Sequence, residues 1–348
     1  MNTNRRSLLS AAGSVGLLSL FGSKPGLVGS GELVHKGKDG SKGVMELCKV
    51  KAEPFVRCCY PTHARFGDGL GSISSQVVVI TAEGLERIDW DVGGEKTCWL
   101  LRLPEQLFIK GQRCHYQIGM DWQLRDGVWC YENCPVRNLR GCWKYADGKL
   151  ELDAASARQR PILGTLAGSI HADSRGAHYT LTARNTSDEV WRGVFFWFCL
   201  NHYQSRITGY RPHFRVGSSW LPAQEMRSAT VHTYYPAPGM VEEYAATDLN
   251  DLFQASHTEL SFPGVVCWNH TAKGPLLVCH YSKDAVAVGS NQNWPCTDTH
   301  LWFGDIAPGE QKSKTGHVLI AKADLKTFAE QADLIAGKDS YLRKAGSL

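Results

Sequence analysis

The densest group of reactive side chains follows the most apolar run of the chain, residues 194–200. Asn201, His202, Tyr203 and Arg206 come soon after this run of Phe, Trp and Leu. Polar side chains at the end of a core strand lie at the rim of a rigid scaffold, where substrate sites are common. β-Elimination from a uronate needs a base, an acid and a group that neutralises the carboxylate, and these residue types can fill the three roles. We therefore predict that these four residues are catalytic. A polar turn without a catalytic role is the alternative, because strand neighbours such as His202 and Tyr203 point to opposite faces.

Further His, Arg and Asn residues repeat this chemistry along the chain. The sequence Cys-x-Asn-His ends at His202 and occurs again ending at His270, and a Cys-His pair ends at His280 on the next expected strand. Amides that precede a tryptophan, as in 291–294, suit sugar hydroxyls, because an indole stacks on a sugar ring while the amides hydrogen-bond to its edge. We expect substrate binding by His270, His280, Arg211, His213, Arg215, Asn291, Asn293 and Trp294.

Histidines on neighbouring strands could instead bind a metal through neutral imidazole nitrogens. Such a site would make the chain a metal-dependent oxidoreductase, and it requires at least three of four residues at one point: His202, His270, His280 and His300. Paired C-x2-C spacings, which structural zinc sites use, are not present in the sequence. We therefore predict no metal site and no cofactor, with a divalent ion as the lesser alternative.

Short strands must position these residues. From Val44 to about Ile320, runs rich in Val, Ile, Phe, Trp, Tyr and Thr alternate with Gly, Pro, Asn and Asp, which is typical of strands and turns. Apolar residues recur at intervals of three and four after 323, which predicts a terminal helix. We expect an all-β protein, a large antiparallel β-sandwich over 44–320, followed by a C-terminal helix and tail over 321–348.

A polar turn, Asn185-Thr186-Ser187, lies between an alternating strand and the apolar strand that follows Trp191. This pattern, over about residues 180–319, resembles the galactose-mutarotase-like supersandwich of exported carbohydrate-active proteins. The resemblance implies a supersandwich-like fold and a polysaccharide or oligosaccharide as partner.

Together with the residues above, the resemblance predicts a lyase that acts on an acidic, uronate-containing polysaccharide by His/Tyr acid–base β-elimination. A non-catalytic carbohydrate-binding or surface-interaction protein is the main alternative, and a sugar epimerase is a further one. A glycoside hydrolase also stays open, since it needs two carboxyl groups beside the scissile bond. Its candidates lie in one polar stretch that is equally typical of a solvated loop: Glu242, Glu243, Asp248 and Asp251.

The amino-terminal segment predicts export. Arg5 and Arg6 precede an apolar run that reaches Phe21 without an acidic residue, as in a twin-arginine signal. The run is shorter than the about 20 residues of a membrane span, so we expect no stable span. We predict a signal over 1–30, a flexible Gly, Ser and Lys-rich spacer over 31–43, and a periplasmic or secreted protein. An ordinary secretory signal or a short anchor is the alternative.

Charge and cysteine content narrow the remaining classes. The formal net charge of +4 includes the basic signal, so the domain itself is close to neutral, which argues against nucleic acid as a partner. All twelve cysteines follow the signal. Several lie in apolar strand-like runs and are expected to be buried thiols. A turn-rich segment that holds Cys130, Cys134 and Cys142 favours a disulfide.

Overall fold

The structure is a computed structural model, and it describes residues 32–34, 44–58, 74–83, 98–109, 112–115, 122–136, 142–146, 149–153, 164–174, 176–202, 211–226, 232–247, 254–271, 274–291 and 296–337. Four predicted site residues lie outside the described residues: Tyr203, Arg206, Asn293 and Trp294. The signal segment 1–30 also lies outside them.

Two large sheets and a two-stranded ribbon account for the described strands. The eleven-stranded sheet has the order β15 (Ser219–Pro222), β14 (Pro212–Val216), β18 (Gly264–Thr271), β19 (Gly274–Tyr281), β22 (Gln311–Lys322), β12 (Gly176–Asn185), β11 (Gly164–Asp173), β8 (Val128–Pro135) and β7 (Gln123–Arg125). Off this path, β2 (Val44–Leu47) pairs with β22, and β1 (Glu32–Val34), inside the predicted spacer, pairs with β2.

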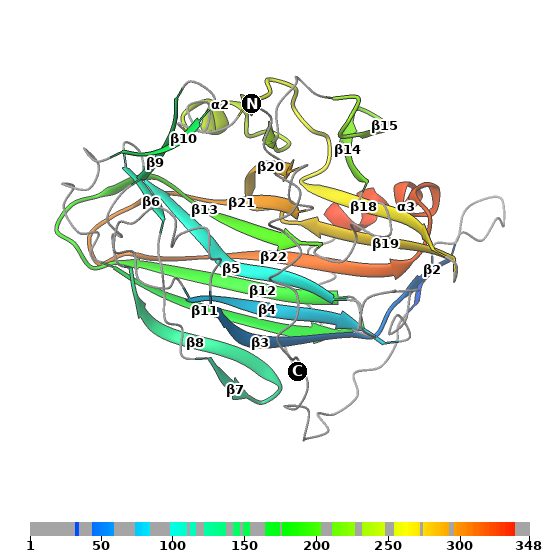
Figure 1. Cartoon of the computed structure of the whole chain (residues 1–348), viewed down its shortest axis with the longest axis horizontal. Coiled ribbons are helices and arrows are strands. Elements are labelled where there is room, and N and C mark those ends of the chain that lie inside the picture. Colours follow the sequence, from blue (N-terminus) through cyan, green and yellow to red (C-terminus); the bar gives the residue numbers. More distant parts are fainter. Residues whose placement is uncertain are drawn as a thin grey trace, which may run out of the picture.

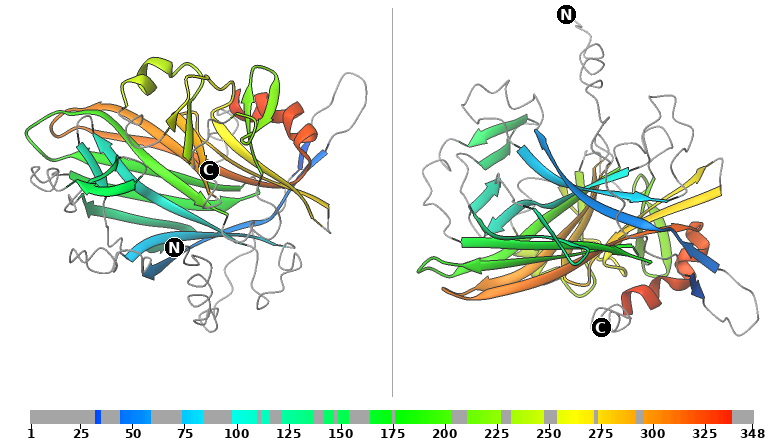
Figure 2. Two further views of the ribbon diagram at one scale, coloured as in Figure 1. Left: turned by 45° about the horizontal axis from the view of Figure 1, so that its top comes forward. Right: turned by 90° about the horizontal axis from the view of Figure 1, so that it is seen from below.

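The nine-stranded sheet has the order β17 (Gln254–Ala255), β16 (His232–Pro236), β20 (Ala285–Asn291), β21 (Cys296–Ile306), β13 (Trp191–Asn201), β5 (Cys98–Ile109), β4 (Ser74–Ala82) and β3 (Val50–Cys58), with β6 (Gln112–His115) beside β5. The ribbon joins β9 (Cys142–Ala146) to β10 (Lys149–Asp153). Pairing is antiparallel apart from the short β16–β17 pair. The predicted all-β antiparallel sandwich is therefore confirmed, and Figure 2 shows the two sheets as packed layers.

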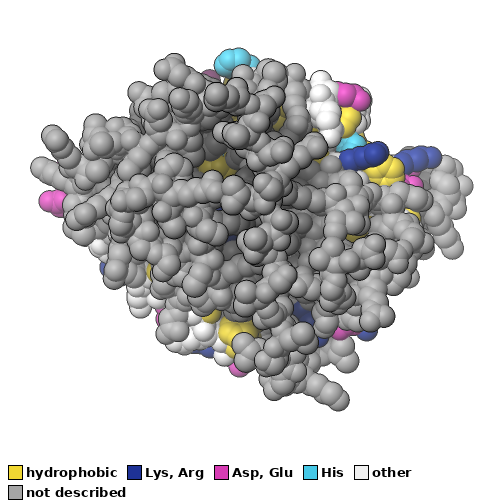
Figure 3. All heavy atoms as spheres, in the orientation of Figure 1, with side chains coloured by type: hydrophobic (Ala, Val, Ile, Leu, Met, Phe, Trp, Pro, Cys, Tyr) yellow, Lys and Arg dark blue, Asp and Glu magenta, His cyan; other side chains and the backbone are white. Residues whose placement is uncertain are grey.

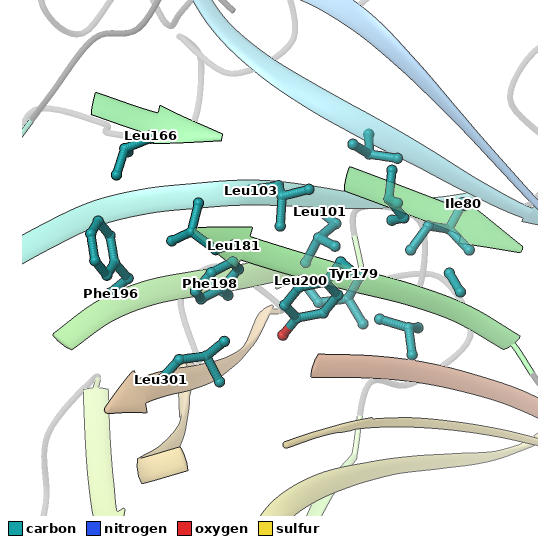
Figure 4. Close-up of a cluster of buried hydrophobic side chains, with 14 of the residues drawn as sticks. Ile80, Leu101, Leu103, Leu166, Tyr179, Leu181, Phe196, Phe198, Leu200 and Leu301 are labelled. Carbon is teal, nitrogen blue, oxygen red and sulfur yellow. The ribbon is translucent and has the colours of Figure 1, made fainter. Parts of the chain in front are cut away.

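The main core lies between the sheets. Alternate residues of β12 and β11 are buried, as a strand with one face on a core requires. Figure 4 shows Phe196, Phe198 and Leu301 of the nine-stranded sheet facing Tyr179 and Leu181 of the eleven-stranded sheet. Each fully buried side chain of this size stabilises the fold by roughly 1.5–3 kcal/mol.

Both sheets also carry apolar clusters on the faces turned away from this core, which we call the outer faces. On the nine-stranded sheet, α2 (Val241–Ala245) places Tyr244 against Trp197, Tyr234 and their neighbours. On the eleven-stranded sheet, α3 (Leu325–Gly337) covers the outer cluster with Phe328 and other side chains. Figure 1 shows α3 beside β18 and β19. Because the nine-stranded sheet is covered on both faces at β13, this strand is buried along most of its length.

The terminal helix agrees with the prediction and ends at Gly337. Of the helices that the structure describes, none has the length and apolar character needed to cross a membrane. Figure 3 shows a few described basic and acidic side chains near one another at the edge of this face.

Seven described cysteines are free thiols, and all but Cys130 are buried. The disulfide expected in the turn-rich segment does not join Cys130 to Cys134, since both are free. They lie in β8, where residues four apart are about 13 Å from each other, whereas a disulfide requires Cα atoms about 4.4–6.8 Å apart.

Candidate functional site

Asn201, the last residue of β13, and His202, which follows it, point to opposite sides of the sheet. His202 is buried and its Nε2 lies 3.1 Å from Thr297 Oγ1 and 3.8 Å from Cys267 Sγ. Since Cys267 belongs to the eleven-stranded sheet, His202 lies between the sheets. Burial, with a smaller contribution from His280, lowers the pKa of His202 to about 3. The imidazole is therefore neutral, and the base predicted for a lyase lies in the inter-sheet core.

His280 belongs to the same buried network. Its Nδ1 donates to the Thr297 carbonyl oxygen at 3.1 Å, and its Nε2 lies 2.9 Å from Tyr179 Oη and 3.1 Å from Thr299 Oγ1. Burial lowers the pKa of His280 to about 4. Both ring nitrogens of His280 thus have partners inside the protein. His202 and His280 meet at Thr297 in a network that cross-links the two sheets.

The remaining predicted residues of the eleven-stranded sheet are not gathered at this network. His213 Nδ1 donates to the Arg211 carbonyl oxygen at 2.9 Å, and burial lowers the pKa of His213. Arg215 binds Asp333 through Nη1 and Nη2, the two terminal nitrogens of its guanidinium group, and so ties β14 to α3. His270 lies on β18, opposite Pro275 of β19. The hydrogen bonds given for His213 and Arg215 lead to Arg211 and to Asp333, away from His202 and His280.

A different group of polar side chains meets on the outer face of the nine-stranded sheet. The register places five residues in one row across β16, β20, β21, β13 and β5: Tyr234, Gly289, Asp298, Cys199 and Arg102. A second row holds Asn291, Cys296 and Asn201. Thus Asn201 and Asn291, both predicted site residues, lie beside this group. Asp298 was not among the predicted residues. Strict alternation along 296–300 could have shown that Cys296, Asp298 and His300 share one face.

Asp298 is the chemical centre of this face. Its side chain is fully buried, and its Oδ2 accepts from Tyr234 Oη at 3.2 Å and from Cys296 Sγ at 3.8 Å. Burial raises the pKa of Asp298 to about 7; a hydrogen bond from Trp197 opposes the rise, and the negative charge of Glu105 adds to it. A carboxyl group of this pKa can both donate and accept a proton near neutrality.

The approach of Tyr234 to Asp298 depends on a glycine. Gly289 lies between them in the row, and a Cβ on Gly289 would lie 2.2 Å from Cδ1 of the Tyr234 ring. Without that Cβ, the phenol can lie across β20 and reach the carboxyl group. Tyr244 of α2 holds β16, the strand of Tyr234, by donating to the Tyr234 carbonyl oxygen at 2.8 Å. The partner of Asp298 is therefore fixed by packing as well as by its hydrogen bond.

Aromatic rings surround His300, the next residue of β21 on this face. Its ring centroid lies 4.6 Å from that of Tyr234, 5.4 Å from Trp197 and 5.5 Å from Phe195. At the other end of the Asp298 row, Arg102 forms an ion pair with Glu105. Their side chains are 21% and 19% exposed, so this end of the row is partly buried, whereas Asp298 is fully buried.

Two thiols adjoin Asp298 and bear on metal binding. The donor atoms of Cys199, Cys296 and Asp298 all lie within 4.8 Å of one another, which is close enough to share an ion. Thiols bind metals after losing their protons. The pKa of Cys199 is raised well above its ordinary value by its hydrogen bond with Cys296 and by burial. The Cys296 thiol donates to Asp298 Oδ2 and Cys199 is hydrogen-bonded to Cys296, so both thiols also belong to the hydrogen-bonding surroundings of Asp298.

Comparisons with known proteins give structural likenesses alone. No protein-family model matches the sequence, and no curated protein is similar to it in sequence. One similar solved structure is a galactose mutarotase-like protein from Lactobacillus casei, at 8% identity and a TM-score of 0.37, covering 70% of this chain and 96% of that chain. A galactose mutarotase related enzyme from Lactobacillus acidophilus is 11% identical with a TM-score of 0.32, covering 72% of this chain and 95% of that chain. An alpha-galactosidase from Geobacillus stearothermophilus, in complex with stachyose, is 10% identical with a TM-score of 0.32, covering 70% of this chain and 35% of that chain.

Proposed function

We propose that the chain is a carbohydrate-active enzyme that moves a proton on a sugar at the outer face of the nine-stranded sheet, with Asp298 as the acid and base. The observation that carries this proposal is the buried carboxyl group whose pKa is raised to about 7 and whose hydrogen-bond partners are held by packing. Acid–base catalysis is most efficient when the pKa of the catalytic group is near the working pH.

The residues around Asp298 suit a sugar. Indole and phenyl faces bind the apolar face of a sugar ring, whereas amides bind its hydroxyl groups. Trp197 and Trp302 lie on this face with the amides of Asn201 and Asn291. Within the described part of the chain, the buried Oδ1 of Asn201 has no hydrogen-bond partner. An acceptor left without a donor is a group that a hydroxyl of the substrate can satisfy.

Epimerisation of an aldose at its anomeric carbon is the reaction that this arrangement supports best. Ring opening takes a proton from the anomeric hydroxyl and gives one to the ring oxygen, and closure reverses both transfers. Asp298 and His300 stand two residues apart on one strand, hence about 7 Å apart, so each could exchange a proton with a different oxygen of the sugar. Tyr234 contacts both residues and can hold their relative orientation.

A uronate lyase is the second candidate. Arg102, at the exposed end of the Asp298 row, could hold a uronate carboxylate in exchange for Glu105. The lyase built on His202, Tyr203, Arg206 and Asn201 remains a prediction. It would require His202 to meet the substrate from its place between the sheets.

Substitution of Asp298 tests the proposal. Asp298→Asn removes the titrating proton and keeps the size, so we expect kcat/KM for anomer exchange of aldoses to fall by about 10²-fold or more. The exchange is measured by NMR or polarimetry, with folding checked by thermal unfolding. Asp305→Asn is the matched control, since Asp305 lies on the same strand but is exposed and paired with Arg192.

The assay panel separates the alternatives. Full activity in Asp298→Asn would contradict the role of Asp298. Absorbance from an unsaturated product, formed from uronate polysaccharides without anomer exchange, would replace the epimerase by the lyase. Sugar binding without either reaction would show a carbohydrate-binding protein.

A further inference from the structure

Three histidines form a row on the outer face of the eleven-stranded sheet, far in the topology from Asp298. His171 of β11 lies directly opposite His178 of β12, and His178 lies directly opposite His317 of β22. These three strands are neighbours in the sheet (Figure 1). The intervening residues of each strand, such as Ile170, Tyr179 and Val318, belong to the inter-sheet core. The histidine side chains therefore point to the opposite, outer face.

The nitrogens of two of these histidines converge. His178 Nδ1 lies 2.7 Å from His317 Nδ1. His178 Nε2 lies 2.8 Å from Asp173 Oδ1. A carboxylate only accepts hydrogen bonds, so Nε2 carries a proton and, in the neutral ring, Nδ1 presents its lone pair toward His317. A histidine that donates one nitrogen to a carboxylate and offers the other to a common point has the arrangement of a metal ligand with its orienting carboxylate.

The third histidine, His171, lies beside His178 and would have to turn to reach the same point. The ring centroids of His171 and His178 lie 5.2 Å apart, and the His171 side chain is exposed and so can turn. His317 is held from the other side by Tyr281, whose ring stacks on it at 5.0 Å. The side chains of His178 and Asp173 are 11% and 25% exposed, which gives an ion a path from solvent.

We propose that His178 and His317, with His171 as third ligand, bind a divalent first-row transition metal such as zinc at this row, and that Asp173 orients His178. Imidazole nitrogens bind zinc at about 2.0–2.1 Å, so two ligands at a tetrahedral angle are about 3.3 Å apart. The two Nδ1 atoms reach this separation when the rings move apart by about 0.6 Å. His317 gives up its hydrogen bond to His178 and moves the proton from Nδ1 to Nε2, so that both Nδ1 atoms present a lone pair to the ion. This site is independent of the function proposed for Asp298.

Zinc titration of the full, chelator-treated protein by calorimetry tests the site. We expect one zinc ion per chain, binding weakened at least 100-fold in His178→Ala and in His317→Ala, and about 10- to 100-fold in Asp173→Asn. His257→Ala is the matched control, because His257 is exposed and lies outside the row. If His317→Ala fails to fold, His317→Phe keeps the ring against Tyr281 and removes the nitrogens.

Three results would overturn the site. They are no zinc binding by the unsubstituted protein, unchanged binding in both His178→Ala and His317→Ala, and binding that is lost in Cys296→Ser but kept in the histidine variants. The last result would place the ion beside Asp298. Loss of binding in the row variants alone, with anomer exchange unaffected, supports the proposal independently of the sugar chemistry.

Discussion

The buried titratable groups differ between the two faces of the nine-stranded sheet: histidines on one face and a carboxyl group on the other. Between the sheets, His202 and His280 are held neutral, and hydrogen bonds of both reach β21 at Thr297. On the outer face, burial and the negative charge of Glu105 raise the pKa of Asp298 to about 7. Neighbouring residues of one strand thus contribute to a structural cross-link and to the site proposed around Asp298, because alternate side chains enter different layers.

His280 makes the free energy of unfolding depend on pH in the acid range. Its folded-state pKa of about 4 lies below the ordinary value of 6.5, so the unfolded chain binds more protons between these values. Stability is fully present above pH 6.5 and falls as the pH drops toward 4, by about 3 kcal/mol for this residue. We expect His280→Gln to flatten this part of the curve of unfolding free energy against pH, measured by urea denaturation. An unchanged slope, equal to that of His257→Gln, would contradict the assignment.

Tyrosine–glycine pairs recur among the strands of both sheets. In three pairs the ring of a tyrosine lies over the glycine directly opposite it: Tyr131 over Gly168, Tyr179 over Gly316 and Tyr234 over Gly289. A Cβ on any of these glycines would lie within 2.2–2.3 Å of the tyrosine ring. Each ring thus lies across its partner strand, and each hydroxyl is hydrogen-bonded farther away, to Leu103, His280 or Asp298. The glycines therefore direct tyrosines to buried polar partners.

Gly316→Ala should displace Tyr179 from His280 and destabilise the fold. Overpacking a core in this way costs about 1–3 kcal/mol, and the hydrogen bond is lost in addition. Chemical denaturation measures the change. In a Tyr179→Leu background the added methyl group meets no ring, so the same substitution should cost less. Equal costs in both backgrounds would show that the pair is not coupled.

Gly289→Ala should instead lower the proposed anomer-exchange activity, because the added methyl group moves Tyr234 away from Asp298.

Sequence patterns predicted where the strands and the helix lie better than they predicted which strands pair with one another. Runs of β-branched and aromatic residues predicted the strands, and the spacing of Leu325, Phe328 and Ala332 predicted α3. Alternation in 296–300 contains the information that Asp298 and His300 share a face. The pairing of β21 with β13, however, is set by packing between residues far apart in the sequence, which no local pattern encodes. The site beside Asp298 depends on that pairing and was therefore missed.

At the scale of the molecule, the two sheets divide the chain into three layers with different chemistry. The inter-sheet core holds the satisfied histidine network, the outer face of the nine-stranded sheet holds Asp298, and the outer face of the eleven-stranded sheet holds the histidine row. Six of the seven described free thiols are buried. A twin-arginine route, which carries folded proteins, would export such a chain with its thiols already protected, and export remains a prediction.

The titration of Asp298 in the presence of sugar is the most direct test of the account. Carboxyl carbons of ¹³C-labelled aspartate are followed by NMR from pH 3 to 9, and the Asp298 signal is the one absent from Asp298→Asn. We predict that this signal titrates near pH 7 and shifts when an aldose is added. A titration near pH 4, or a signal that is unaffected by any sugar that the protein binds, would contradict Asp298 as the acid and base of the site.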